Sequence, residues 1–445
     1  MINRTKIKNI IELITMVILG AVISIVAIRI LILKSEDGIS QMQALYRQPE
    51  DSIDVLFLGG SLVYVDIDPG IMWDDYGIAG FDLGGAEAPP WVSYYHLKEA
   101  FREQKPKILC YEVSTACIFP ELVQRSERGA QNNYGMKWNR NRVEQLYINS
   151  DKDDFRVRLN PYNIMHGRYN DIQKDDFVNE RGSMDFKGFD PADGIMEFEM
   201  PVLTGTTEVE PCSEKAEKYI RKIINLARDE GCTVLLFSSP HKLNDHEEKQ
   251  YNYIQQIADS EGVEFLDFNK KYFDIDMDFS EDLSDWFHLN YSGSCKFTQY
   301  LGAVLKSKYD IPDRRGDARY LSWDRNARLQ SQDRNNLKIR MCEDEDEVLS
   351  LASDGYVLFM ISDGIAAIFE NNKVVALADA DAEGLFRMTH QSGDSRFVFS
   401  EVMDRGIRMC SLFINDREIK REYREFLFIY DTIRNEYVGW KLLDD

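Results

Sequence analysis

The chain begins with an apolar run long enough to cross a membrane. Leu13 to Leu33 reads LITMVILGAVISIVAIRILIL, 21 residues in which Arg29 is the only charged side chain. At 1.5 Å per residue, a helix of this length extends about 30 Å, the thickness of a bilayer's hydrocarbon core. Arg29 lies one turn from the end of the run, where its long side chain can reach the headgroups. The pattern predicts one transmembrane helix.

The flanking charges predict how this helix is oriented. Three basic residues, at positions 4, 6 and 8, precede the run, whereas Lys34 is followed at once by Glu36 and Asp37. The positive-inside rule then leaves the N-terminus in the cytoplasm and the rest of the chain outside. A cleaved signal peptide is the alternative, but ILIL after Arg29 lacks the small residues of a cleavage site. We therefore expect an uncleaved single-pass anchor in the cell membrane.

Beyond a short polar stalk, apolar runs alternate with amphipathic stretches. Four runs rich in Val, Ile, Leu and Phe predict buried strands, namely IDVLFLG (53–59), KILCYEV (107–113), TVLLFS (233–238) and VEFLDF (263–268). Helical patterning lies between and after them, at 92–102, 213–228, 247–259 and 292–306. This alternation predicts an α/β domain with a parallel sheet, helices on both faces and a ligand site at the carboxyl edge of the strands.

The remaining pattern divides the chain further. We expect a cytoplasmic tip and anchor over 1–37 and the α/β domain over 38–310, with residues 118–211 as a long polar insertion that serves as a lid or substrate cap. Residues 311–336 are charged, contain Pro312 and Gly316, and are assigned to a linker. From 337 to 445, short apolar runs alternate with turn signals such as Asp363-Gly364 and Asn371-Asn372, which predicts a smaller, mostly β domain.

Composition narrows the function classes. Among 445 residues, Lys and Arg number 53 and Asp and Glu 76, giving a net charge of −23. A nucleic-acid partner is disfavoured because phosphate contacts need clustered Lys and Arg. Seven cysteines without a CxxC pair signal neither a zinc site nor a disulfide framework. We expect no metal and no cofactor.

Candidate chemistry begins where the first predicted strand ends. Ser61 follows Gly59 and Gly60 directly. A serine at that edge, with glycines allowing close backbone approach, suits a nucleophile whose own amide faces an oxyanion. By itself a Gly-Ser pair after a strand is more often an ordinary turn, so the motif needs a base elsewhere in the chain.

The sequence DWFH, residues 285–288, supplies that base immediately before a predicted helix that begins near Tyr291. A serine hydroxyl needs a base within hydrogen-bond reach, and the base needs a group that holds its tautomer. Asp285 and His288 can present a carboxylate and an imidazole to one side, with Nδ1 toward Asp285 and Nε2 toward Ser61. The alternative is a solvent-exposed Asp beside a structural His.

Three blocks together resemble the SGNH/GDSL hydrolases, and within them the membrane-anchored branch related to D-alanyl-transfer proteins of teichoic-acid modification and to alginate O-acetylation proteins. The blocks are FLGGSLVYVDIDP (57–69), FDLGGAEAPPWVSYYHLKEAF (81–101) and DWFHLNYSGSCKFTQYLGAVL (285–305). The resemblance covers residues 52–308. It implies an SGNH-type sheet and a serine esterase or O-acyltransferase that acts through an acyl-serine.

Carried over by position, the resemblance assigns roles to individual residues. It implies Ser61 as nucleophile, His288 as general base and Asp285 as its orienting partner, with oxyanion donors from the amides of Ser61 and of Gly84 or Gly85. Two departures stand out. Gly60 replaces the acidic or polar residue common before the serine, and no GxND block follows Glu112, so the family's asparagine donor is missing.

The insertion and the C-terminal part add binding hypotheses. His166 and Arg168 are candidates to replace the missing donor or to bind an anionic substrate group, although a surface pair is an equal alternative. Trp138 is a candidate sugar-stacking platform. Residues 337–445 resemble the β-rich domain of interleukin-like EMT inducers, which implies a binding or positioning module.

Two functions from different classes follow. The first is an extracytoplasmic serine acyl-transfer enzyme, an O-acetyltransferase or esterase acting on a cell-surface polysaccharide, with polysaccharide-assembly proteins as further partners. The second is a catalytically weak glycan-binding or assembly factor that keeps the SGNH fold. Hydrolysis and transfer share their first half-reaction, so the sequence leaves both open.

Overall fold

The structure is a computed structural model of the chain. It describes residues 4–32, 37–118, 126–177, 186–342, 344–362, 365–405, 407–423 and 427–439. The chain divides into two compact units, Met1–Ala327 and Arg328–Asp445, and the division falls inside helix α15, Leu321–Met341. The stretch expected as a linker, 311–336, thus contains most of a 21-residue helix.

The first unit is built on a five-stranded sheet in the order β2-β1-β3-β4-β5. All neighbouring strands are parallel. Their bounds are β1 Val55–Gly59, β2 Gly80–Gly84, β3 Ile108–Glu112, β4 Thr233–Ser238 and β5 Glu264–Asp267. In this order the chain reverses its direction of progress between β1 and β3, and the carboxyl ends of these two strands are where ligands bind in such sheets. The predicted α/β class is confirmed.

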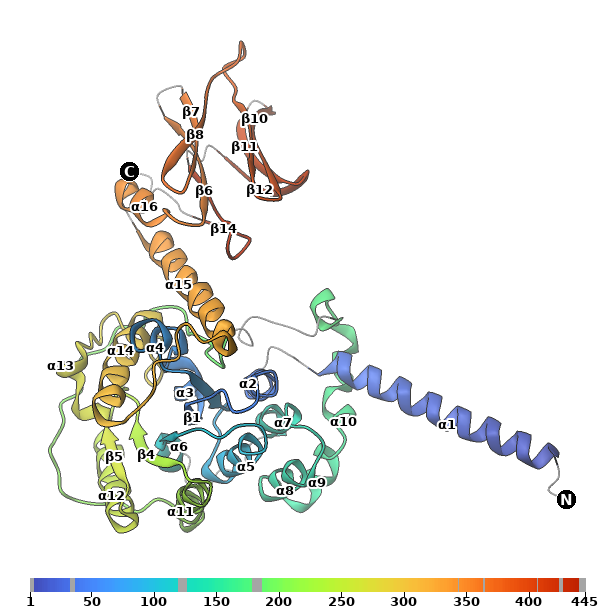
Figure 1. Cartoon of the computed structure of the whole chain (residues 1–445), viewed down its shortest axis with the longest axis vertical. Helices are drawn as coiled ribbons and strands as arrows, with labels where there is room; N and C mark the ends of the chain where they lie inside the picture. Colours follow the sequence, from blue (N-terminus) through green and yellow to red (C-terminus); the bar gives the residue numbers. More distant parts are fainter. Residues whose placement is uncertain are drawn as a thin grey trace. The chain divides into compact units, whose positions relative to one another are not determined.

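Helices cover both faces of this sheet (Figure 1). One core packs Leu56 and Leu58 of β1 against helices α5, α11 and α12, while the other packs Val55 and Phe57 against helix α14. Alternate residues of β1 therefore point into opposite cores, as a strand buried on both faces requires. The bounds of these helices are α5 Pro90–Ala100, α11 Glu214–Asp229, α12 Asp245–Glu261 and α14 Tyr291–Lys308.

The four predicted strands and four predicted helices are present within a few residues of their expected bounds. Strand β2 is missing from the sequence-based prediction, because its sequence GFDLG has two glycines and an aspartate and no apolar run. Asp82 in its middle is fully buried, and burial raises the pKa of its carboxyl well above the usual range. The short helices α3 Ser61–Asp66 and α4 Pro69–Tyr76 after β1 were likewise not predicted.

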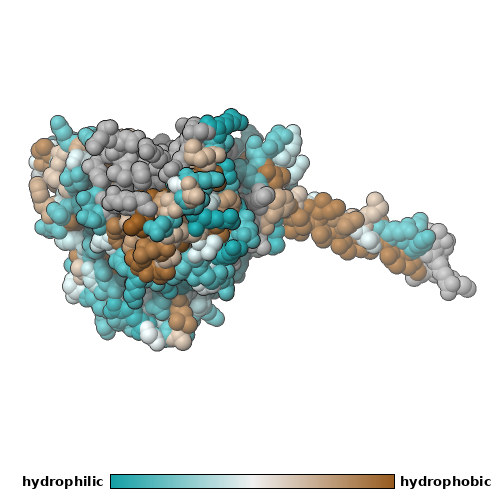
Figure 2. All heavy atoms as spheres, turned by 90° about the horizontal axis from the view of Figure 1, so that it is seen from above, coloured by the Kyte–Doolittle hydropathy of each residue, from teal (hydrophilic) through white to brown (hydrophobic). Residues whose placement is uncertain are grey.

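The N-terminal helix and the insertion lie on the same unit. Helix α1, Arg4–Leu31, contains one apolar stretch, Ile7–Leu31, that is long and apolar enough to cross a membrane. Figure 2 shows it as a hydrophobic rod that projects from the body and becomes hydrophilic toward its N-terminal end. Helix α2, Ile39–Leu45, follows. Helix α6, Ser114–Ile118, leads into the insertion, whose helices are α7 Ser126–Tyr134, α8 Arg140–Ile148, α9 Lys152–Arg158, α10 Tyr162–Met165 and the 3₁₀ turns η1 His166–Asn170 and η2 Lys174–Phe177. Residues 189–211 of the insertion form neither helix nor strand.

The second unit is a β structure that follows α15 and α16, Glu345–Leu351. It has one sheet in the order β12-β11-β10-β9 and another in the order β14-β13-β6-β7-β8, with every pair antiparallel. Asn371 and Asn372 connect β7 to β8 with φ of 50° and 60°, the two-residue turn that the sequence predicts. The Asp363-Gly364 turn lies outside the described residues. Strand bounds are β6 356–362, β7 365–370, β8 373–379, β9 387–392, β10 395–404, β11 407–414, β12 417–423, β13 427–431 and β14 436–438.

Candidate active site

Ser61 stands where strand β1 passes into helix α3. Gly60 precedes it in an extended conformation and a side chain there would clash, since a Cβ on Gly60 would lie 2.5 Å from Thr115 Cγ2. This contact explains why the chain has glycine where the family pattern has a larger residue. Because Ser61 is the first residue of α3, its N–H has no carbonyl acceptor within the helix.

The loop before helix α14 brings the base to this serine. His288 Nε2 lies 2.7 Å from Ser61 Oγ, and His288 Nδ1 lies 2.8 Å from Asp285 Oδ2. A carboxylate only accepts, so Nδ1 carries the proton and Nε2 accepts from the serine hydroxyl. The structure therefore brings together the three side chains that the sequence singled out, although 227 positions separate Ser61 from His288.

Asp285 is fixed by its own backbone as well as by the imidazole. Its Oδ1 accepts from the amides of Phe287 at 2.7 Å and His288 at 2.8 Å. Partial burial alone would raise the pKa of Asp285, but the hydrogen bonds and charge of His288 and these two amides outweigh it and hold the pKa at about 2. The carboxylate thus stays ionised at any physiological pH and can stabilise a protonated His288.

These residues open into a pocket of about 370 Å³. It is lined by Asp37, Ser61, Tyr64, Val65, Ala86, Glu87, Arg128, Asp190, Pro191, Ala192, Ser284, Asp285 and His288. Four carboxyl groups face one guanidinium and the imidazole, and the Arg128 guanidinium lies 3.7 Å from Glu87 Oε1. Such a wall offers acceptors to hydroxyl or amino groups of a substrate, beside the apolar side chains of Val65, Ala86, Pro191 and Ala192.

A carboxyl pair forms one side of this pocket. Asp190 is mostly buried, and this burial together with the neighbouring Asp37 carboxyl raises the pKa of Asp190 to about 7. Asp37 also interacts with the Tyr64 hydroxyl, whose pKa burial raises well above its usual range. The Asp190 carboxyl therefore keeps a proton up to about neutral pH, next to the Asp37 carboxyl. Sequence reasoning missed both residues, because they are separate aspartates in polar stretches that carry no motif.

The oxyanion donors differ from the expectation. Gly85 N–H donates to Gly59 O at 3.2 Å and belongs to the sheet ladder. Asp82 N–H donates to Lys187 O, on the side of β2 away from β1. Amides two residues apart in a strand point to the same side, so Gly84 N–H also points away from β1. Neither glycine lines the pocket, and of the three residues expected to donate to an oxyanion only Ser61 lines it.

Gly84 and Gly85 have a packing role instead. A Cβ on Gly84 would lie 2.6 Å from Gly60 O and 2.7 Å from the Tyr64 ring, and one on Gly85 would lie 2.1 Å from Asn132 Oδ1. Close approach of β2 to the turn after β1 therefore requires glycine at position 84, and close approach of Asn132 in α7 requires it at position 85.

The three substrate-binding candidates of the insertion lie outside the pocket. Arg168 donates to Leu31 O at 2.6 Å and to Asp176 Oδ1 at 2.9 Å, so its guanidinium holds the end of α1. His166 is exposed and its Nδ1 contacts Tyr162 O at 3.0 Å. Trp138 is 61% exposed, with the Arg142 guanidinium 4.3 Å from its ring centroid. None of the three is placed to compensate for an oxyanion donor at Ser61.

Asp66 joins the nucleophile's helix to the base's loop. It ends α3, is fully buried, and its Oδ1 accepts from Leu289 N–H at 3.1 Å. Burial raises the pKa of Asp66 well above its usual range, and Leu289 N–H and Ser239 oppose that shift. The hydrogen bond fixes the residue that follows His288, so Asp66 positions the imidazole relative to Ser61. The VDIDP stretch after the serine contained this residue, but nothing in its spacing marked it.

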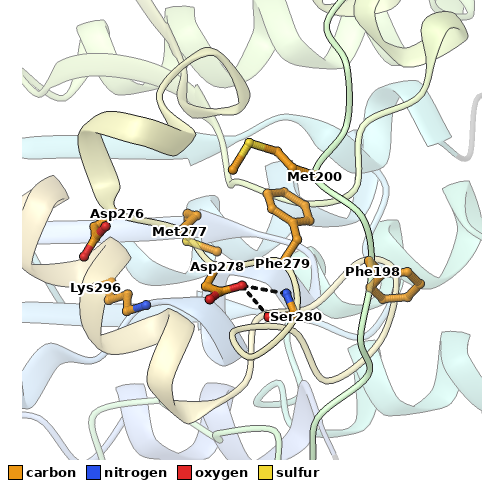
Figure 3. Close-up of a pocket in the computed structure, with 8 residues that line it drawn as sticks. All are labelled: Phe198, Met200, Asp276, Met277, Asp278, Phe279, Ser280 and Lys296. Atoms are coloured by element: carbon orange, nitrogen blue, oxygen red, sulfur yellow. Dashed lines mark hydrogen bonds between the residues drawn. The ribbon is translucent and has the colours of Figure 1, made fainter.

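A second pocket, of about 410 Å³, has a different character (Figure 3). It shares no residue with the Ser61 pocket and contains no histidine. Its one cation, Lys296, is 2.7 Å from the buried Asp282, and the Ser280 hydroxyl donates to Asp278 at 2.6 Å. Its serine therefore contacts a carboxylate and no imidazole. Across the described residues, no group of three or more His, Cys, Asp or Glu side chains is arranged to hold a metal ion.

Comparisons with known proteins add little to this geometry. No family model matches the sequence, and no curated protein matches it. A gut microbial diltiazem-metabolizing enzyme is among the similar solved structures, with 10% sequence identity, a TM-score of 0.23, and coverage of 85% of this chain and 72% of that one. What the site does must therefore be argued from its own residues.

Proposed function

We propose that the protein is a membrane-anchored extracytoplasmic serine acyl-transfer enzyme of the SGNH type, an O-acetyltransferase or esterase that acts on a cell-surface polysaccharide. The observation that carries the proposal is the chain of contacts from Ser61 Oγ through His288 to Asp285, at 2.7 and 2.8 Å. When a serine donates to an imidazole that in turn donates to a carboxylate, the serine becomes nucleophilic at neutral pH, because the imidazole takes its proton as the new bond forms.

The first half-reaction follows from these contacts. Ser61 Oγ bonds to the carbonyl carbon of an ester while its proton moves to His288 Nε2, and the Ser61 amide faces the developing oxyanion. The bond to the leaving alcohol then breaks, and His288 returns the proton to that alcohol oxygen. An acyl-serine and a free alcohol result. Asp285 stays ionised throughout and stabilises the imidazolium.

The acceptor decides the second half-reaction. Water bound near His288 gives hydrolysis, and a glycan hydroxyl in the same place gives transfer, with the proton again passing through Nε2. The carboxyl groups of Asp37, Glu87 and Asp190 favour an acceptor rich in hydroxyl groups, because carboxylates accept hydrogen bonds from them. The three basic residues in the first turns of α1, ahead of its uncharged run, favour a cytoplasmic N-terminus and an external active site.

A second candidate, a glycan-binding assembly factor with weak catalysis, has its own support. The amides of Gly84 and Gly85 are turned away or engaged, and each oxyanion donor is typically worth about 3 kcal/mol of barrier. A site with the Ser61 amide as its main donor would bind a polysaccharide and turn it over slowly.

Labelling of the full-length protein in detergent separates the two. We expect a fluorophosphonate probe to attach to the wild type and to Ser280→Ala, a serine of the other pocket, and not to Ser61→Ala. An acetyl ester then distinguishes the products: acetyl on an added polysaccharide indicates transfer, and free acetate indicates hydrolysis. Equal labelling of wild type and Ser61→Ala, or glycan binding without any acyl-serine in mass spectrometry, would reject the enzyme.

A further inference from the structure

The outer end of helix α1 is fixed to the insertion. The Leu31 side chain is 6% exposed and packs with four buried residues, Ile39, Ala130, Tyr134 and Met165. The Arg168 guanidinium donates to Leu31 O and to Asp176, so it joins the last turn of α1 to η1 and η2. Helix α10 and both 3₁₀ turns lie against α1 (Figure 1). We call residues 160–177, which contain these three elements, the juxtamembrane segment.

The juxtamembrane segment exposes large side chains that a water-facing surface would rarely group together. Tyr162 is 50% exposed, Tyr169 66% and Phe177 64%, with Ile172 at 39%. Tyrosine is enriched where a membrane meets water, because its ring is apolar and its hydroxyl can remain hydrated. The segment has two basic and three acidic residues, so its charge is close to neutral and does not itself attract anionic lipids.

The length of the apolar part of α1 determines where the juxtamembrane segment lies relative to the bilayer. Leu13 to Leu31 is free of charge except for Arg29, and at 1.5 Å per residue it spans about 28 Å. A bilayer whose hydrocarbon core begins at Leu13 therefore ends at Leu31, the residue to which Arg168 is bonded. The exposed aromatic side chains stand beside that same turn of helix.

We propose that the juxtamembrane segment lies in the interfacial zone of the bilayer and binds the lipid surface through Tyr162, Tyr169 and Phe177. The inference rests on the proposal that α1 spans a membrane. It adds that the catalytic unit does not swing on a stalk but is held against the bilayer by a second contact. Interfacial aromatic side chains beside a spanning helix fix its depth and rotation in this way.

This placement bears on the substrate. Asp37 lines the Ser61 pocket and is six residues beyond Leu31, so fully extended chain puts it at most about 20 Å from the end of α1. The pocket therefore opens close to the headgroups. An acyl donor presented at the membrane surface would reach Ser61 without leaving the bilayer's vicinity.

Tryptophan reporters in the full-length protein test the contact. The protein is placed in nanodiscs of zwitterionic lipid, with and without lipid brominated near the carbonyl end of the acyl chain, and each variant's emission is compared with that of the parent. The reporters are Tyr169→Trp and Phe177→Trp in the segment, Leu19→Trp in the middle of α1, and Phe273→Trp in the short helix α13, Tyr272–Ile275. Phe273 is the matched control, since it is an aromatic residue of the same unit and 85% exposed.

We expect the brominated lipid to reduce the added emission about two-fold at positions 169 and 177 and to leave position 273 unchanged, because interfacial side chains reach the upper acyl chains. Quenching at position 19 with none at 169 or 177 would overturn the interfacial contact and keep the anchor. Absence of quenching at position 19 would overturn both. The two segment reporters are independent variants, so misfolding of one leaves the other to decide.

Discussion

The two units each contain a serine, a histidine and a carboxylate in contact, and the comparison shows what connectivity contributes. In the first unit the imidazole stands in the middle, 2.7 Å from Ser61 and 2.8 Å from Asp285. In the second unit the carboxylate of Glu370 stands in the middle, 2.9 Å from His390 and also accepting from the Ser392 hydroxyl. The residue types are the same and the order is different.

Order decides the chemistry. A hydroxyl that donates to a carboxylate faces a weak base, and the Ser392 hydrogen bond is the main cause that lowers the pKa of Glu370 below its usual range. A hydroxyl that donates to imidazole faces a base whose unperturbed pKa is near neutrality. The first arrangement is the one that can activate a serine under the proposed function, and the second joins strands β7 and β9 to each other.

The largest expected effect comes from removing the carboxylate in each group. Asp285→Asn should lower kcat for an activated ester about 10³-fold or more. The amides of Phe287 and His288 keep the side-chain oxygen of the variant, so its NH2 group faces Nδ1 and, as a donor, favours the wrong tautomer of the imidazole. Glu370→Gln, the same change in the second unit, should leave kcat within about two-fold. Comparable losses in both variants would break the distinction.

The second largest effect on kcat is expected from the hydrogen bond by which Asp66 positions the loop that carries His288. Asp66→Ala should lower kcat about 10- to 100-fold with KM unchanged, since Leu289 loses its hydrogen-bond acceptor and His288 moves relative to Ser61. Asp66→Asn retains a carbonyl oxygen and should restore most of the activity. A loss of kcat that Asp66→Asn fails to rescue, in a protein of normal thermal stability, would contradict positioning through this bond.

Buried carboxyl groups around the site predict how stability depends on pH. Burial raises the pKa of Glu112 from 4.5 to about 7. The folded state then keeps a proton that the unfolded state has lost, so stability is highest below pH 4.5, falls as pH rises to about 7 and is level above. The shift corresponds to about 3 kcal/mol.

Glu112→Gln should remove the part of the fall in the free energy of unfolding between pH 4.5 and 7 that comes from Glu112. Chemical unfolding between pH 4.5 and 7.5, followed by tryptophan emission, measures it. Asp190→Asn should remove a further part, because the pKa of Asp190 is also raised to about 7. Slopes equal to that of the wild type in both variants would contradict the raised pKa values.

The smallest effect on catalysis is expected from a residue that belongs to neither of the two serine, histidine and carboxylate groups. Trp138→Ala should change kcat and KM for a small ester by less than about two-fold, because the exposed indole lies outside the Ser61 pocket and packs on Arg142. Steady-state kinetics on the purified protein measure this. A ten-fold rise in KM would show that the indole contacts substrate after all.

Local pattern carried much of the prediction. Apolar runs bounded by turns identified β1, β3, β4 and β5, because strands buried on both faces leave continuous apolar sequence. Residues Ser61, Asp285 and His288 stood out because strand ends and helix entrances can be read from the sequence. Strand β2 was not predicted, because a glycine-rich strand with a buried aspartate shows neither an apolar run nor an alternation of apolar and polar residues.

The sequence by itself determined the long apolar N-terminal helix, the α/β class and which serine, histidine and aspartate are candidates, because these depend on local composition and spacing. Only the tertiary structure decided that Ser61 meets His288, that the amides of Gly84 and Gly85 turn away, that Asp37 and Asp190 share the pocket, and that Arg168 holds the end of α1. Those contacts join residues far apart in the chain, and no periodicity encodes which distant groups folding brings within bonding distance.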